Sequence, residues 1–171
     1  MKTTGRQETT ECISALGTAL SDRMALLATA ESCTGGLIAH EATNVPGSSR
    51  WFAGGVVAYS NRIKQDVLEV PENVLSAHGA VSRETVLAMV QGVRKLLGTQ
   101  AALAVSGIAG PDGGTPEKPV GTVWIAWALD ETLHSDLYRF SGTRLEIKQQ
   151  AAATALEGMV ALLQHHATNR F

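Results

Sequence analysis

The chain has 171 residues, 44% of which are hydrophobic, and its formal net charge at pH 7 is −2. This length and apolar content suit one domain with a sizeable core. A chain with this charge lacks the positive field that attracts nucleic-acid phosphates non-specifically, so we expect no nucleic-acid partner. No segment approaches the ~20 consecutive apolar residues of a membrane-spanning helix, and we therefore expect no membrane partner and a cytoplasmic location.

The sequence contains two cysteines, Cys12 and Cys33, without the spacing of a disulfide scaffold. Such usage is typical of a reducing compartment, where both would be free thiols. The sequence has no HExxH or Cys-x-x-Cys motif and no tight cluster of histidines or carboxylates. Because metal sites need such ligand groups, we expect no metal and no other cofactor.

Polar residues dominate the first ten positions, and we predict a flexible tail over 1–10. Apolar residues spaced three and four apart then predict a helix over 11–22, and the apolar run 24–30 predicts a buried strand. Thr34 is expected to cap a helix over 34–44, which a proline follows closely.

The remaining predicted elements, in chain order, are a strand over 54–59, helices over 61–68 and 82–97, strands over 101–106, 122–129 and 132–140, and a helix over 144–164. Residues 107–121 hold five glycines and three prolines with few large apolar residues, so we predict a loop there. A long loop in a compact domain is often functional. We expect a second flexible tail over 166–171, which leaves a single domain over 11–165.

Helices alternate with strands in this pattern, which predicts an α/β fold built from layers. Strands separated by a helix can lie parallel, whereas the short link Asp130–Glu131 can join only antiparallel neighbours. The sheet is therefore expected to be mixed and mostly parallel. The sequence leaves open whether the chain forms a homo-oligomer.

The segment AESCTGG, residues 30–36, lies where a predicted buried strand turns into a helix. Backbone amides in the first turn of a helix lack intrahelical partners and can receive an anion. Ser32 could therefore attack a carbonyl group while the amides of Thr34, Gly35 and Gly36 stabilise the oxyanion. The alternative is purely structural: Ser32 or Thr34 caps the helix, and the glycines allow tight packing.

A serine nucleophile needs a base, and none of the five histidines lies in a recognisable triad context. Lys64 is the competing candidate. A lysine acts as a base only when it is largely neutral, which requires a pKa well below its ordinary value of about 10.4. Burial against the sheet could supply this, but most lysines remain charged in water, and spacing alone does not place Lys64 beside Ser32.

A second glycine-rich segment follows a later predicted strand. Its residues Ser106, Gly107, Ala109 and Gly110 offer backbone amides that suit phosphate, ribose or carbonyl groups, although the same sequence is also good turn chemistry. Arg144 stands at the start of the last predicted helix, where its guanidinium could clamp a phosphate or carboxylate with two hydrogen bonds. The alternative for Arg144 is an ordinary surface arginine.

Taken together, several segments resemble the CinA (competence/damage-inducible) C-terminal domain family in order and spacing. They are AESCTGG at 30–36, GSSRWFAGGVVAYSNRIK at 47–64, HGAVS at 78–82, SGIAGPDGGTPEKPVGTVW at 106–124 and FSGTR at 140–144. The resemblance covers almost the whole chain and implies a three-layer α/β/α sandwich around a mixed sheet, in the short form with a single domain.

Family members with deamidase activity hydrolyse the carboxamide of nicotinamide mononucleotide, giving nicotinic acid mononucleotide and ammonia, through a serine and lysine pair without a metal or redox cofactor. The resemblance therefore implies that Ser32 is the nucleophile and Lys64 the base, with a pyridine mononucleotide as substrate. It also implies functional roles for Tyr59 and Arg144. Many relatives carry aspartate before this arginine, where the present chain has Thr143, a residue that can equally cap the following helix.

Two other functions remain open on the sequence. One is a non-catalytic nucleotide-binding module linked to competence or DNA damage, which keeps the glycine-rich loops but not the activity of the serine and lysine pair. The other is an acyl hydrolase with Cys33 as nucleophile, which is weaker because no histidine is placed to generate the thiolate. Ammonia release from nicotinamide mononucleotide distinguishes the enzyme from the binding module.

Overall fold

The computed structural model describes residues 3–168, with side chains from residue 9 onward. Its strands are β1 (Leu27–Glu31), β2 (Phe52–Val57), β3 (Ala101–Gly107), β4 (Thr122–Leu129) and β5 (Thr132–Arg139). Its helices are α1 (Thr3–Asp22), α2 (Leu37–Thr43), α3 (Asn61–Asp66), α4 (Glu72–His78), α5 (Arg83–Leu97) and α6 (Arg144–Thr168), together with the 3-10 helix η1 (Ser48–Arg50). The predicted alternation of helices and strands is confirmed. No described helix is long and apolar enough to cross a membrane.

The five strands form one sheet in the order β2-β1-β3-β4-β5. β1 pairs in parallel with β2 and with β3, whereas the β3–β4 and β4–β5 pairs are antiparallel. The mixed sheet is therefore as predicted. β4 alone among the described strands runs against the others, because the loop that leads to it contains no crossover helix. Four strands thus share one direction, although parallel and antiparallel pairings are equal in number.

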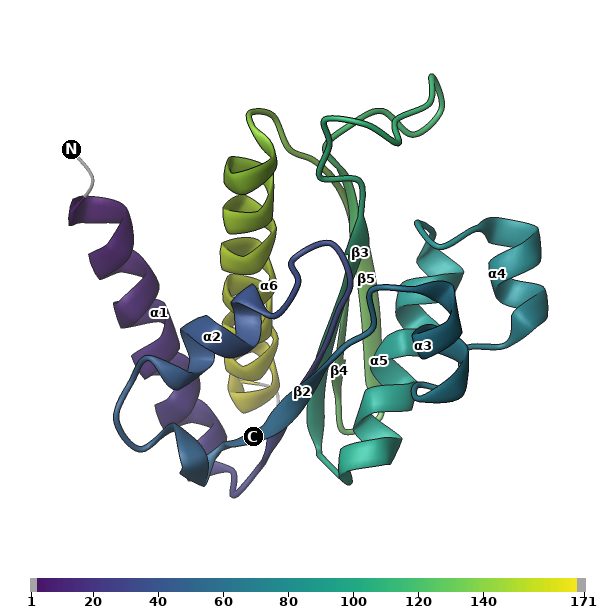
Figure 1. Cartoon of the computed structure of the whole chain (residues 1–171). Coiled ribbons are helices and arrows are strands. Elements are labelled where there is room, and N and C mark those ends of the chain that lie inside the picture. Colours follow the sequence, from purple (N-terminus) through teal and green to yellow (C-terminus); the bar gives the residue numbers. More distant parts are fainter. Residues whose placement is uncertain (1–2, 169–171) are drawn as a thin grey trace.

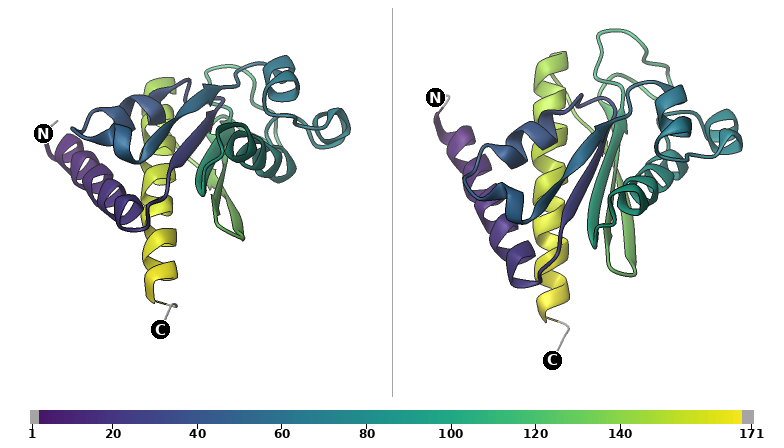
Figure 2. Two further views of the ribbon diagram at one scale, coloured as in Figure 1. Left: turned by 90° about the horizontal axis from the view of Figure 1, so that it is seen from below. Right: turned by 60° about the horizontal axis from the view of Figure 1, so that its bottom comes forward.

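Helices cover both faces of the sheet, which confirms the three-layer sandwich. Helices α1, α2 and α6 lie on one face, and α3, α4 and α5 lie on the other (Figure 1). Figure 2 shows the same layers from below, with α6 and α5 on opposite sides of the strands. Each helical layer buries its own hydrophobic cluster against the sheet.

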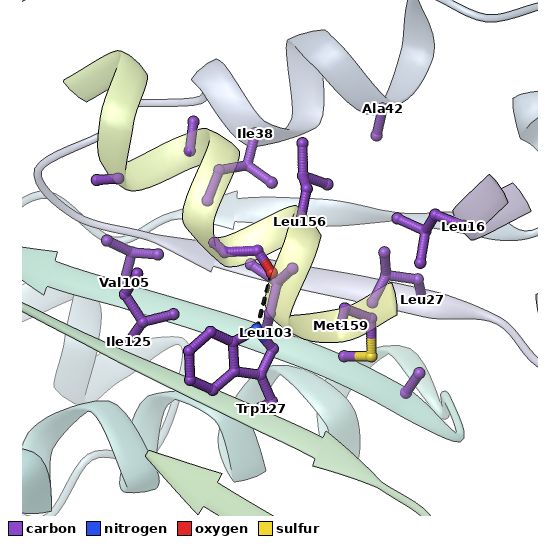
Figure 3. Packing of buried hydrophobic residues seen from close by; sticks show 14 of the residues in the cluster. Leu16, Leu27, Ile38, Ala42, Leu103, Val105, Ile125, Trp127, Leu156 and Met159 are labelled. Atoms are coloured by element: carbon purple, nitrogen blue, oxygen red, sulfur yellow. Dashed lines mark hydrogen bonds between the residues drawn. The ribbon is translucent and has the colours of Figure 1, made fainter. Parts of the chain in front are cut away.

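Large side chains fill the layer beneath α6. Leu103 and Trp127 project from the sheet into a cluster that includes Leu156 and Met159 of α6 (Figure 3). The Trp127 indole Nε1 donates a 2.7 Å hydrogen bond to the carbonyl oxygen of Ala155, so its polar atom is satisfied inside the core. This packing anchors the helix whose first residue is Arg144.

Small side chains line the opposite face of the central strands, beneath α5. They are Ala28, Ala30, Ala102, Ala104, Ala126 and Ala128, all fully buried. Against them α5 packs apolar residues that include Val86, Met89, Val90 and Val93. Alanine occupies little volume, and this face is therefore completed by the larger residues of the helix rather than by those of the strands.

Two predicted boundaries are wrong at the ends of the chain. α1 begins at Thr3, so residues 3–10 are helical rather than a flexible tail. α6 continues to Thr168, past the predicted helix end and into the predicted tail over 166–171. Both helices are held by buried apolar residues, and a nucleated helix extends readily because each added residue contributes one further hydrogen bond. The predictions for residues 1–2 and 169–171 lie outside the described residues.

The sequence prediction misses two short helices, η1 and α4. Pro71 occupies the N-cap of α4, and Glu72 lies in its first turn. A proline followed by an acidic residue is a helix-start signal, because proline has a fixed φ and a carboxylate favours the positive end of the helix dipole. The predicted elements instead leave residues 69–81, which contain this helix, without a helix or strand.

The topology brings three chain segments to one edge of the sheet. β2, β1 and β3 are parallel neighbours, so their carboxyl ends lie side by side. Tyr59 follows β2, Ser32 follows β1, and Ser106 lies near the end of β3. The carboxyl edge of parallel strands is where open α/β sheets usually bind ligands.

Candidate active site

Ser32 occupies the bend between β1 and α2. Its amide donates a 2.9 Å hydrogen bond to the carbonyl oxygen of Val105 on β3, and its own carbonyl accepts one from the Gly35 amide at 3.2 Å. Gly35 and Gly36 both have positive φ, at 64° and 93°, which glycine adopts at little cost. The turn therefore holds Ser32 by its backbone on both sides, with only 8% of the residue exposed.

The Glu31 carboxylate organises this turn and was not predicted from the sequence. One of its oxygens, Oε2, accepts hydrogen bonds from the Thr34 hydroxyl at 2.8 Å, the Gly36 amide at 2.9 Å and the Ile38 amide at 3.1 Å. The other, Oε1, accepts one from the Ala39 amide at 2.8 Å. The side chain is 1% exposed, so the four donors replace the water that it has lost.

These contacts correct two expectations about the turn. Thr34 does not cap α2: Gly36 occupies the N-cap without a side-chain hydrogen bond, and Thr34 instead donates to Glu31. The Gly35 amide donates to the Ser32 carbonyl oxygen and the Gly36 amide donates to the Glu31 carboxylate. Neither amide is therefore available to stabilise an oxyanion. A carboxylate from the preceding strand thus fills the anion position at the start of the helix.

Lys64 lies on α3, which begins where the Ser60 hydroxyl accepts a 3.2 Å hydrogen bond from the Ile63 amide. Although lysines are rarely buried, Lys64 is 1% exposed. Its Nζ lies 3.0 Å from Ser32 Oγ, 2.8 Å from the carbonyl oxygen of Ala58 and 3.4 Å from that of Tyr59. Burial lowers the pKa of Lys64 from its ordinary value. The structure thus joins two residues that the spacing of the sequence could not place together.

Tyr59 and Arg144 meet at the mouth of the site. Arg144 donates from Nη2 to the Tyr59 hydroxyl at 2.9 Å and from Nη1 to the carbonyl oxygen of Gly110 at 2.5 Å. The helix that carries Arg144 starts with a reciprocal cap, in which the Glu146 amide donates to the Thr143 hydroxyl at 3.4 Å and the Thr143 amide donates to Glu146 at 2.7 Å. Thr143 therefore caps α6 as expected.

The glycine-rich loop after β3 is fixed from two sides. The Ser106 hydroxyl donates a 2.7 Å hydrogen bond to the carbonyl oxygen of Ala80, and Lys118 donates to the carbonyl oxygens of His78 and Val81 at 3.0 and 2.8 Å. At Gly107 a Cβ would lie 2.6 Å from the Val123 side chain, so only glycine fits there. The end of α4 and the residues that link it to α5 thus support the loop.

Most of the predicted site residues share one pocket of about 270 Å³. Those in its lining are Ser32, Tyr59, Lys64, Ser106, Gly107, Ala109, Gly110 and Arg144. The predicted residues outside the lining are Thr34, Gly35 and Gly36, which belong to the turn that follows Ser32. The lining residues that sequence analysis did not single out are Asn61, Ala80, Val81, Ile108, Asp112 and Gly113. Cys33, the alternative nucleophile of the sequence analysis, also lines the pocket. A larger hollow between α1 and residues 44–51 contains neither Ser32 nor Lys64.

Cys33 lines the pocket but is poorly suited to act as the nucleophile. Burial raises the pKa of its thiol to about 12, despite smaller opposing effects from its backbone amide, Lys64 and Lys148. A thiol with this pKa is protonated at neutral pH, and only the thiolate is strongly nucleophilic. In the part of the chain that the structure describes, no three histidine, cysteine or acidic side chains gather closely enough to hold a metal ion.

The chain is similar to known proteins over most of its length. The family model described as CinA C-terminal domain matches residues 9–163. The chain is 48% identical over 154 residues to "Nicotinamide-nucleotide amidohydrolase PncC" of Pseudomonas putida, covering 88% of this chain and 96% of that protein. It is 51% identical to a CinA-like protein of Syntrophotalea carbinolica, covering 81% of this chain but only 34% of that longer protein.

Solved structures give the same result. The competence/damage inducible protein CihA from Agrobacterium tumefaciens matches with a TM-score of 0.88 and 40% identity, covering 90% of this chain and 94% of that one. Competence damage-inducible protein A from Klebsiella pneumoniae matches with a TM-score of 0.89 and 36% identity, covering 92% and 98% of the two chains. The chain therefore belongs to the CinA C-terminal domain family.

Proposed function

We propose that this chain is an amidohydrolase that converts nicotinamide mononucleotide to nicotinic acid mononucleotide and ammonia, with Ser32 as nucleophile and Lys64 as base. The observation that carries the proposal is the 3.0 Å contact between Ser32 Oγ and the buried Lys64 Nζ. Nucleophile and base must lie within hydrogen-bond reach, and this pair does. The similarity to the amidohydrolase of Pseudomonas putida supports the choice of substrate.

The surroundings of Lys64 suit both protonation states of its amine. The charged amine has three N–H donors, and its partners are Ser32 Oγ and the carbonyl oxygens of Ala58 and Tyr59. The neutral amine keeps two donors for the carbonyls, and its lone pair accepts the Ser32 hydroxyl. The proton can therefore move between Ser32 and Lys64 without any change of partners, and the lowered pKa favours the neutral form.

In the first half of the reaction, Lys64 accepts the proton of Ser32 as Oγ attacks the carboxamide carbon. The resulting tetrahedral intermediate collapses when the C–N bond breaks, and Lys64 transfers the proton to the departing nitrogen, which leaves as ammonia. An ester between Ser32 and the nicotinoyl group remains. Water then attacks this ester with Lys64 as base, and Lys64 returns the proton to Ser32 Oγ as the acid product forms.

Backbone amides of the glycine-rich loop are our candidates for the oxyanion donors. Ala109 and Gly110 line the pocket, and their amides donate to no acceptor within residues 3–168. The Gly35 and Gly36 amides are already engaged. Tyr59 lines the pocket, its backbone carbonyl oxygen accepts a hydrogen bond from Lys64, and its hydroxyl accepts one from Arg144.

Ammonia release from nicotinamide mononucleotide tests the activity, and hydroxylamine tests the intermediate. The wild-type chain is expected to release ammonia and nicotinic acid mononucleotide in equal amounts, and hydroxylamine is expected to divert part of the product to the hydroxamate. Binding of the nucleotide without ammonia release would instead favour the nucleotide-binding module. Ammonia release without any hydroxamate would oppose the acyl-enzyme.

A further inference from the structure

Residues 78–81 run from the end of α4 towards α5, and Ala80 and Val81 among them line the pocket. Only the first of these four residues is helical, so regular secondary structure does little for their carbonyl oxygens. All four oxygens nevertheless accept a hydrogen bond from a side chain. The donors, in the chain order of the acceptors, are Lys118, Thr85, Ser106 and again Lys118. We call this segment the 78–81 wall, an irregular backbone whose polar groups are satisfied by side chains from outside it.

β3 holds the 78–81 wall and Ser32 in a fixed relation. The carbonyl oxygen of Val105 accepts a 2.9 Å hydrogen bond from the Ser32 amide. The next residue, Ser106, donates a 2.7 Å hydrogen bond to the carbonyl oxygen of Ala80. Val105 and Ser106 are both buried. A group that is attached to the wall is therefore also placed relative to the nucleophile.

Lys118 attaches the glycine-rich loop to this wall. Its ammonium donates to the carbonyl oxygen of His78 at 3.0 Å and to that of Val81 at 2.8 Å. His78 is the last residue of α4, a position whose carbonyl oxygen lysine side chains often bind. The Lys118 amide donates to the Thr115 hydroxyl at 3.1 Å, and its carbonyl oxygen accepts from the Thr115 amide at 3.0 Å. Both ends of this long side chain are thus held.

The return leg of the loop, residues 118–121, packs directly against its outgoing leg, residues 108–113. A Cβ built on Gly110 would lie 2.6 Å from Val120 Cγ1, so the two legs leave no room for a side chain there. The Gly121 amide also donates to the carbonyl oxygen of Ile108 at 2.7 Å. In such close packing, a shift of the return leg displaces the Gly110 amide as well.

We propose that Lys118 is a positioning residue, which joins the return leg to the 78–81 wall and thereby fixes the Gly110 amide relative to Ser32. Lys118 does not line the pocket and acts through the residues that it holds. The catalytic consequence rests on the proposed function, in which the Ala109 and Gly110 amides are the candidate oxyanion donors. Such donors stabilise the transition state only when they are already in place, and a misplacement of about 1 Å can cost ~100-fold in rate.

The first test measures turnover of nicotinamide mononucleotide by Lys118→Met, which keeps most of the aliphatic stem but removes the ammonium. Turnover is expected to fall roughly tenfold to a hundredfold with a smaller change in KM, because a displaced oxyanion donor affects the transition state more than the bound substrate. Lys118→Arg keeps donors for both carbonyl oxygens and should restore most of the turnover. Arg23→Met is the matched control. It removes a cation that binds Asp130 at 2.9 Å, beyond the amino end of β1, and should leave turnover unchanged.

The second test follows amide hydrogen exchange, which needs no catalysis. In Lys118→Met, exchange should become faster at 78–82 and at 108–121 together, while β1 and α6 keep their protection and show that the fold is intact. Arg23→Met should leave both segments as in the wild type. A wild type that released no ammonia would contradict the proposed function, whereas faster exchange of both segments would still support the contact through Lys118. Unchanged exchange in either segment, unchanged turnover, or equal losses of turnover in Lys118→Met and Lys118→Arg would overturn the positioning role.

Discussion

Two buried charged residues flank Ser32, and their surroundings differ. Glu31 on the α2 side and Lys64 on the α3 side are each 1% exposed. Glu31 meets four donors, three of which are backbone amides at the start of α2. Lys64 meets only neutral acceptors, and burial lowers its pKa. Equal burial therefore stabilises the backbone on one side and favours a reactive amine on the other.

The difference arises because the Glu31 side chain meets backbone amides, whereas the Lys64 side chain meets backbone carbonyl oxygens. The first turn of a helix presents amides without intrahelical partners, so a carboxylate placed there finds donors that are already oriented. The end of β2 presents carbonyl oxygens, which accept hydrogen bonds from an amine in either protonation state. Ala58 joins the two sides, because its amide donates to the Glu31 carbonyl oxygen at 2.8 Å and its carbonyl accepts from Lys64.

Substitution of Ser32, which lies between Glu31 and Lys64, should have the largest effect on turnover. Ser32→Ala is expected to lower turnover of nicotinamide mononucleotide by roughly 10⁴-fold or more, because the acyl-enzyme cannot form. Cys33→Ala is the matched control and should retain most of the activity, since its thiol is protonated at neutral pH. Ammonia release by both variants, with circular dichroism to confirm folding, checks the prediction. Equal losses in the two variants would contradict the assignment of Ser32.

Changing the lysine while keeping its charge should have the next largest effect. Lys64→Arg is expected to lose about 10³-fold in turnover, because arginine stays protonated and cannot accept the proton of Ser32. Lys64→Met should lose a similar amount. Turnover at saturating substrate from pH 6 to 10 is the measurement. Near-wild-type turnover by the arginine variant would show that charge is sufficient and would eliminate the lysine-base mechanism.

The same pKa shift predicts two pH trends in the wild type. Turnover should rise with pH, because the neutral fraction of Lys64 grows as the pH passes its lowered pKa. Stability should also rise from the lowered pKa towards the ordinary value of about 10.4, since the unfolded chain binds the extra proton in this window. Urea unfolding of the wild type and Lys64→Met between pH 7 and 10 isolates this trend, which the methionine variant should lack. Parallel curves for the two proteins would contradict it.

On the other side of Ser32, Glu31→Gln tests whether the carboxylate positions the turn. The amide group brings a donor to a place where backbone donors already converge, so we expect a loss of about 1–3 kcal/mol in unfolding free energy. Turnover should fall by roughly tenfold to a hundredfold through a displaced Ser32, with a smaller change in KM.

Ile38→Val separates positioning by Glu31 from general loss of stability. This fully buried residue of α2 should cost about 1 kcal/mol on truncation, yet leave the Ser32 turn in place and turnover near the wild-type value. If the two variants lose activity in proportion to stability, Glu31 has no positioning role.

The comparison of Glu31 and Lys64 also shows how far the sequence alone could go. The strand over 122–129 is predicted at its observed bounds, and the helix over 82–97 to within one residue of the observed Arg83–Leu97, because local apolar spacing and turn signals determine them. The strand-to-helix bend at Ser32 was predicted for the same reason. Contact between Ser32 and Lys64 was not, since it depends on β2 pairing with β1 and not on any local pattern. The pairing of Ser32 with Lys64 was predicted only from the resemblance to the CinA C-terminal domain family.

Glu31 shows what local interpretation misses. A glutamate at the end of an apolar strand gives no sign of burial, and its donors lie three to eight residues later, at the start of a helix whose boundary was predicted too early. Thr34 was assigned the capping role that this carboxylate takes. The hydrogen-bond partners of such a buried polar group come together only when the chain folds. Its role can therefore be predicted from the sequence only through a known family pattern.

The smallest effect should come from Arg144→Lys at the rim of the site. This variant keeps the positive charge but loses the guanidinium group that donates to two acceptors at once. The guanidinium spans the Gly110 carbonyl oxygen and the Tyr59 hydroxyl at once, at 2.5 and 2.9 Å. A lysine ammonium is a single point and cannot hold both groups in that geometry. We expect KM for nicotinamide mononucleotide to rise about tenfold, equivalent to about 1.4 kcal/mol, with turnover reduced less.

Steady-state kinetics of Arg144→Lys beside Tyr59→Phe separates the two contacts of the guanidinium. The phenylalanine variant removes only the hydroxyl partner and leaves the contact with Gly110. If Arg144 acts mainly by binding the substrate, the lysine variant should raise KM more than the phenylalanine variant does. If it acts mainly by fixing Tyr59, the two variants should match. Unchanged KM and turnover in the lysine variant would contradict a role for Arg144 in the site. The position would then tolerate any cation, and the shape of the guanidinium would not matter.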